Sequence, residues 1–276
     1  MTVFKSLSAD DRVSTKTLLH EAIPITGTIL SGTYNNSPSD SEFNIQNFTH
    51  GMFQSVYDYP FLSSSANHIF DISFGTADTS PLVVTNQIAK KDNVYNQMAQ
   101  VLMGYDKDGN IQKFDEDGNI AAGGAKITEA IFMPFSRLLV KDEIKKGSFS
   151  MSVGVAAAHA VNGTQFNKSL SISDVDGATS FKVNSPAGEY GILYATSSHP
   201  IPGAPTLDTT STHKETLSDG NVYWRAGLIY YQAGVVVLTS SMFMATTDGG
   251  YLDGTSANTC TFVPSGQAKT AANTSL

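Results

Sequence analysis

Two acidic pentapeptides are the residues whose types and spacing come nearest to a metal site. Asp106–Asn110 has the sequence DKDGN, and Asp115–Asn119 has the sequence DEDGN. A calcium-binding EF-hand loop needs glycine at its sixth position and glutamate at its twelfth. Counted from Asp106, the sixth position is Ile111 and the twelfth is Asp117. The spacing therefore favours two turns at strand ends over a calcium site.

No pattern for catalysis stands out among the histidines and serines. The chain has 6 histidines, and no two have the close spacing of a zinc-protease pair. His213 lies in a polar stretch, so we expect it to be exposed. Neither a G-x-S-x-G elbow nor a phosphate-binding glycine loop before a helix occurs. We predict no enzymatic activity, cofactor or metal, although two carboxylates facing each other across a cleft would leave no trace in sequence.

Composition limits the classes of partner. Of the 276 residues 41% are hydrophobic and only 15% are charged, with a net charge of -8. This acidic balance argues against a nucleic-acid partner, which would need a basic face. The single cysteine, Cys260, excludes an intrachain disulfide and cysteine-based zinc sites. No apolar run approaches the roughly 20 residues that span a bilayer, and residues 1–12 do not resemble a signal peptide, so we expect no membrane insertion.

Hydrophobic periodicity places the elements. The segment Gly227–Phe243 predicts two core strands separated by a glycine-containing turn. Asp92–Gly104 predicts a helix with an apolar face of Val94, Met98, Val101 and Leu102. Phe53, Val56 and Tyr57 recur at helical spacing, so a short helix is expected before Pro60, and a long loop is expected over Ser197–Asp219. Strands are expected at His68–Phe74, Ile131–Met133, Ser148–Val155, Leu170–Ile172, Phe181–Val183 and Tyr190–Tyr194.

These elements predict a β-rich α+β fold. Residues 1–47 form an extended N-terminal arm, residues 48–245 the main domain, and residues 246–276 a loose C-terminal tail. The main domain combines a helical and aromatic middle segment with an antiparallel, sandwich-like core. The apolar side chains of the N-terminal arm are too sparse to form a core of their own, so we expect the arm to lie against another surface. The candidate interface residues are Leu18, Leu19, Ile29, Leu30 and Trp224.

Six blocks of the sequence, taken in order, carry a resemblance to a known class of proteins. They are HEAIPITGTILSGTY, HGMFQSVYDYPFLSSSANHIFD, KKDNVYNQMAQVLMG, FSRLLVKDEIKKGSFSMSVGV, SPAGEYGILY and GLIYYQAGVVVLTSSMF. From about Leu18 to Phe243 the chain resembles virion structural proteins of tailed bacteriophages, particularly the T4-like phages of marine cyanobacteria.

The resemblance implies a structural subunit of the virion, assembled in the cytoplasm of the host bacterium. Its partners would be other virion proteins in a symmetric homo- or hetero-oligomer. The tail or baseplate is the first station to consider, and the neck or head is the second. No catalytic residue carries over.

Two other functions compete with this interpretation. A receptor- or glycan-binding adhesin would use Trp224, the only tryptophan, with Tyr223 as an aromatic sugar platform. The same tryptophan is more simply a core or interface anchor. A hydrolase acting on the host surface is the third hypothesis.

The arm generates a prediction. A chain that starts near Phe48 should stay folded and soluble but no longer enter particles, because the removed segment is expected to lie on a neighbouring subunit. Protease should cut the arm in the free protein and spare it in the particle. Unfolding of the truncated chain would instead assign the arm to the core of its own domain.

Overall fold

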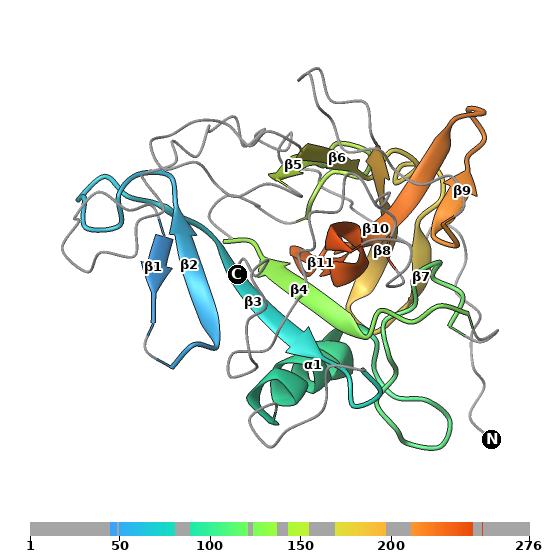
Figure 1. The fold of residues 1–276 in the computed structure, drawn as a ribbon, viewed down its shortest axis with the longest axis horizontal. Coiled ribbons are helices and arrows are strands. Elements are labelled where there is room, and N and C mark those ends of the chain that lie inside the picture. The colour runs from blue at the N-terminus through green and yellow to red at the C-terminus, as the bar shows by residue number, and fades with distance from the viewer. Residues whose placement is uncertain are drawn as a thin grey trace, which may run out of the picture.

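The computed structural model of the chain describes residues 45–48, 50–80, 89–120, 124–136, 143–154, 169–196, 211–244 and 250. These residues build a single antiparallel sheet of 11 strands and one α-helix, α1 (Ala89–Leu102) (Figure 1). The strands are β1 (Ile45–Asn47), β2 (Phe53–Tyr57), β3 (His68–Thr76), β4 (Glu129–Pro134), β5 (Ser150–Gly154), β6 (Ser169–Ser173), β7 (Lys182–Ser185), β8 (Gly188–Thr196), β9 (Lys214–Thr216), β10 (Val222–Tyr230) and β11 (Val235–Thr239).

The strand order along the sheet is β1-β2-β3-β4-β11-β10-β8-β6-β5. Off this path, β7 pairs with β8 and β9 pairs with β10. The β-rich α+β prediction is confirmed, and the expected strands in the described residues are present. The sandwich-like core was expected to consist of two sheets, whereas all strands of the described residues belong to one hydrogen-bonded sheet.

The hairpin β10–β11 lies at the middle of the sheet. Its strands pair from Gly227 opposite Leu238 to Tyr230 opposite Val235. In the turn Gly234 has φ +66°, its amide donates to Tyr230 O at 2.9 Å, and its own carbonyl accepts from Phe135 N at 2.8 Å. The predicted pair of strands around a glycine turn is therefore confirmed.

Apolar side chains line both faces of this central sheet. On one face, called the inner face here, β10 contributes Trp224, Ala226 and Ile229, and Tyr231 follows directly after the strand. On the opposite face, called the helix face here because α1 covers it, the strand contributes Leu228 and Tyr230. Strands buried on both sides have continuous apolar runs, which explains why Leu228–Tyr231 and Val235–Leu238 lack alternation.

A β-bulge in β10 shifts this pattern by one residue. Arg225 pairs with Tyr194 and Gly227 pairs with Leu193, so Ala226 is the extra residue. A side chain at Gly227 would place its Cβ 2.0 Å from the carbonyl oxygen of Val237. Because one residue of shift exchanges the two faces of a strand, the bulge is what puts both Ala226 and Ile229 on the inner face.

The helix packs through one apolar stripe. Val94, Tyr95, Ala99 and Leu102 are buried against the helix face, which confirms the predicted helix and most of its packing stripe. Val101 was expected in that stripe, but it is 65% exposed. Tyr95 is buried against the sheet instead of Val101. The Tyr95 hydroxyl donates to Ile127 O at 2.6 Å, so the polar end of the buried ring is hydrogen bonded.

The sheet curls over its inner face. The rings of Phe135, just after β4, and Phe149, just before β5, have centroids 6.0 Å apart. Five strand spacings separate β4 from β5 along the sheet, about 24 Å if the sheet were flat. The buried Asp174 carboxylate ties the segment before β5 to the end of β10, because it accepts from Gly147 N at 2.7 Å, Phe149 N at 2.8 Å and the Tyr231 hydroxyl at 3.1 Å.

Two expectations about local structure are wrong. Phe53–Tyr57 is the strand β2 and not a helix, because its backbone is hydrogen bonded to β1 on one side and β3 on the other. The expected loop over Ser197–Asp219 contains β9, which extends the sheet by pairing with the outer half of β10.

Most of the predicted N-terminal arm and C-terminal tail lies outside the described residues. Leu18, Leu19, Ile29 and Leu30 lie in residues 1–44, and all of the C-terminal tail except Gly250 lies outside as well. β1 (Ile45–Asn47) pairs with β2, so the last three residues of the assigned arm are part of the sheet.

The turn of the central hairpin predicts the effect of a substitution. Gly234→Val should destabilise the fold by more than about 1 kcal/mol, because a β-branched residue is strained at positive φ. No atom lies within 4 Å of a Cβ at this position, so the penalty is conformational and not steric. Gly234→Asn is the matched control, since asparagine tolerates this region. Equal melting temperatures for wild type and Gly234→Val would contradict the assignment.

Candidate functional site

Each of the two acidic pentapeptides folds into a turn, and the two turns are of the same type. Asp106 Oδ1 accepts from the backbone amides of Asp108 at 2.9 Å and Asn110 at 2.8 Å. Asp115 Oδ1 accepts from the amides two and four residues on, each at 3.2 Å. The glycines, Gly109 and Gly118, have φ +85° and +72°. The predicted turns are confirmed, and the first aspartate of each is used to close the turn.

The environments of the two turns differ. Asp106 and its neighbours are at the surface, whereas the Asp115 side chain is fully buried and contacts the Lys126 ammonium. Burial raises the pKa of Asp115, a hydrogen bond with Asp117 raises it further, and Lys126 opposes both. The same hydrogen bond lowers the pKa of Asp117. The second turn is thus held inside the molecule with a cation of the chain itself.

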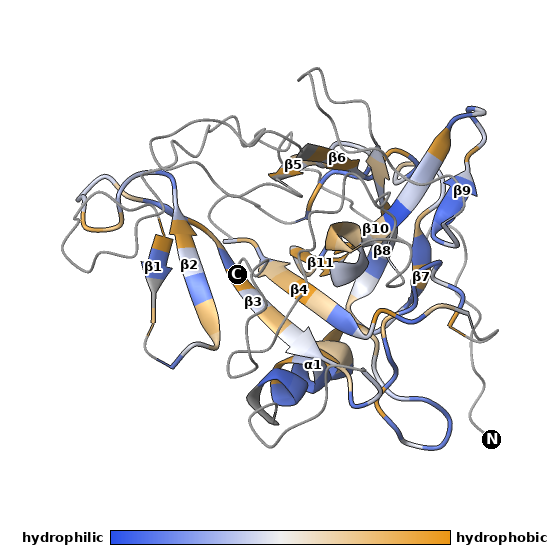
Figure 2. Cartoon of the chain, in the orientation of Figure 1, coloured by the Kyte–Doolittle hydropathy of each residue, from blue (hydrophilic) through white to orange (hydrophobic). Residues whose placement is uncertain are grey.

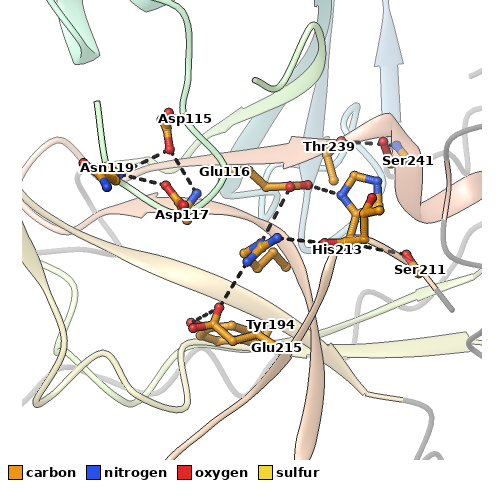
Figure 3. A network of polar contacts seen from close by, with 12 residues as sticks. Asp115, Glu116, Asp117, Asn119, Tyr194, Ser211, His213, Glu215, Thr239 and Ser241 are labelled. Atoms are coloured by element: carbon orange, nitrogen blue, oxygen red, sulfur yellow. Dashed lines mark hydrogen bonds and ion pairs between the residues drawn. The ribbon is translucent and has the colours of Figure 1, made fainter. Parts of the chain in front are cut away.

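Next to this turn lies a buried cluster of charged side chains (Figure 3). Glu116, whose side chain is 4% exposed, contacts His213 Nδ1 through Oε1 at 2.5 Å. Its other oxygen, Oε2, lies 3.6 Å from Arg225 Nε. The carboxylate therefore joins an imidazole that precedes β9 to a guanidinium on β10.

Arg225 holds three parts of the cluster together. Its other guanidinium nitrogens reach Glu215 Oε2 at 3.5 Å and the carbonyl of Thr212 at 3.0 Å. The Tyr194 hydroxyl donates to the same Glu215 oxygen at 3.3 Å. Burial raises the pKa of the Tyr194 phenol, and the Glu215 carboxylate adds to the effect. The planar fork of an arginine suits such a junction better than a lysine.

Local pairing explains how these residues meet. β9 pairs with the outer half of β10, and the Arg225 amide donates to His213 O at 3.0 Å. On the other side, Phe114 is fully buried in the helix-face core and fixes the chain one residue before Asp115. Glu116 is thereby held at the point where the turn meets the sheet.

The structure corrects the expectation for His213, whose side chain is only 13% exposed. It was expected in solvent because its own neighbours are polar, but its partner is 97 residues away in sequence. Trp224, the neighbour of Arg225 in sequence, lies on the inner face. It is 6% exposed, so its side chain packs within this chain. Sequence reasoning missed Glu116 and Arg225; the only local signal was the acidic turn around Glu116.

Comparison with known proteins adds no assignment: the sequence matches no model of a protein family, no curated protein and no solved structure. Among the described residues, no group of three or more histidine, cysteine, aspartate or glutamate side chains is arranged to hold a metal ion. No helix in those ranges is long and apolar enough to cross a membrane. The cluster is therefore characterised by its own geometry, a carboxylate held between an imidazole and a guanidinium.

The turns predict the response to metal removal. EGTA should leave the thermal melting curve unchanged, because the first aspartate of each turn is saturated by backbone amides and Lys126 stands beside Asp115. A drop of several degrees on chelation, reversed by calcium, would show that a cation stabilises the fold.

Proposed function

We propose that this chain is a structural subunit of a tailed-phage virion, acting through protein–protein interfaces in the tail or baseplate. The first block of sequence that resembles such proteins lies outside the described residues, and the other five overlap structural elements. They contain β2, β5, β11 and nearly all of α1 and β8, with the start of β3 and the second half of β10. The implied role of the resemblance is assembly and not catalysis.

The observation that carries an interface role is a projecting aromatic part of the sheet. The wing, defined as residues 45–48 and 50–67, contains β1, β2 and the connection to β3 and lies away from the central hairpin (Figure 1). It touches α1 where the Lys91 ammonium donates to Gly51 O at 3.3 Å. Within it the rings of Phe48 and Phe53 are 4.8 Å apart, and those of Tyr57 and Phe61 are 6.5 Å apart. These four rings belong to neither core cluster.

Several apolar side chains of the wing remain exposed in the single chain. Leu62 is 67% exposed, Tyr59 52% and Phe53 37%. Figure 2 shows apolar residues at both ends of β2, which lies next to the edge strand β1 of the sheet. Exposed aromatic and large apolar side chains gathered on one part of a fold are typical of protein–protein contacts. The low charged fraction of 15% supports the same role.

The burial of Trp224 removes the main support for the adhesin hypothesis. Trp224 was the candidate sugar platform, but it is 6% exposed and packs in the inner-face core. Tyr223 remains near the surface, where its hydroxyl donates to Asp219 at 2.7 Å. A neck or head station would use interfaces of the same kind and remains the alternative location for the proposed subunit.

The wing predicts a separation between folding and assembly. The double substitution Tyr59→Ser and Leu62→Ser should leave the melting temperature nearly unchanged, because both side chains are largely exposed. It should strongly reduce incorporation into particles in cells infected with phage lacking the native gene, measured by mass spectrometry of purified particles. Val183→Ser, at an apolar residue 71% exposed on β7, is the control and should assemble normally. Normal incorporation of the double variant would exclude the wing as an interface.

A further inference from the structure

The Glu116, His213 and Arg225 cluster joins two parts of the chain that no strand pairing connects. One is the turn segment, defined as residues 104–120 and 124–126, which runs between α1 and β4. The other is the β9–β10 pair. Across this junction the structure has the contacts Glu116–His213 and Glu116–Arg225. The attachment of the turn segment at this point therefore involves a group that titrates near neutral pH.

Burial makes the charge of His213 matter. The side chains of Glu116, His213 and Arg225 are 4%, 13% and 17% exposed. Charges at such positions interact more strongly than charges in bulk water, because solvent screens them less. A neutral imidazole with its proton on Nδ1 keeps the hydrogen bond to Glu116 but loses the ionic attraction.

The surrounding charges favour the protonated imidazole. Among the described residues, four carboxylates and two permanent cations, Lys126 and Arg225, stand in or beside the cluster. A third cation, Lys182 of β7, packs on Gly118, so carboxylates still outnumber the cations. Within the described ranges, the titratable and charged groups that face the junction come from the turn segment, β7, β8, β9 and β10. They are Asp115, Glu116, Asp117, Lys126, Lys182, Tyr194, Glu215 and Arg225.

We propose that Glu116, His213 and Arg225 form a proton-dependent latch that fastens the turn segment to the β9–β10 pair more tightly at mildly acidic pH than at alkaline pH. The sign follows from the charges. The ionic contribution is present while His213 is protonated and Glu116 is ionised, and it is lost as pH rises through the titration of the imidazole. This inference does not depend on the proposed function.

Hydrogen exchange of the full chain tests the latch. Backbone amides of residues 114–119 should be roughly threefold to tenfold better protected at about pH 5.5 than at about pH 8.5, after correction for intrinsic exchange. His213→Gln keeps a hydrogen-bond donor toward Glu116 but cannot become charged, so it should abolish this pH dependence. The same protection at both pH values in the wild type, or the same dependence in His213→Gln, would overturn the proposal.

A second contact between a histidine and a carboxylate, that of His68 with Asp71, supplies the matched control. His68 Nε2 lies 2.8 Å from Asp71 Oδ1, but both side chains are 32% exposed and both belong to β3. His68→Gln should therefore leave the pH dependence of the turn segment unchanged.

The wild type alone tests the proposal if His213→Gln does not fold. Imidazole nitrogen-15 shifts follow the protonation of each histidine, and the change in protection must coincide in pH with the titration of His213. A change that follows another histidine would also overturn the latch.

Discussion

The fold depends on the central hairpin and on the close approach of its two strands at Gly227. A side chain there would collide with the carbonyl of Val237, so the bulge in β10 requires glycine. The bulge lets one strand supply Trp224, Ala226 and Ile229 to the inner face, and Tyr231 follows directly after the strand. With both faces apolar, the hairpin can bind α1 on one side and the curled end of the sheet on the other. The flanking strands take their positions from it.

The buried charge cluster is a consequence of the same arrangement. The bulge separates the inner half of β10, which pairs with β11, from the outer half, which pairs with β9. Arg225 stands at this transition and meets carboxylates from two directions, Glu116 and Glu215. Burying such groups stabilises a structure only when each charge finds its partners. The cluster fixes the position of the turn segment against the β9–β10 pair through the contacts of Glu116 with His213 and Arg225.

Sequence patterns predicted what is determined locally. The run Val235–Leu238, the Asp-Gly-Asn turns and the helix before Gly104 are each set by neighbouring residues, and each is present. Phe53–Tyr57 was assigned wrongly because pairing with two other strands overrides the spacing of its apolar residues. The contact between Glu116 and His213 left no local signal, since it exists only once β9 is paired with β10.

The position of Asp174 has a consequence for the order of folding. Its carboxylate can meet the amides of Gly147 and Phe149 once β5 pairs with β6, but it meets the Tyr231 hydroxyl only after β8 has joined β6 to β10. Closing such a non-local contact costs chain entropy that the earlier, local β10–β11 pairing does not. The hairpin is thus placed to form in the rate-limiting transition state and the contact between Asp174 and Tyr231 after it. Weakening that contact would accelerate unfolding while leaving the refolding rate almost unchanged.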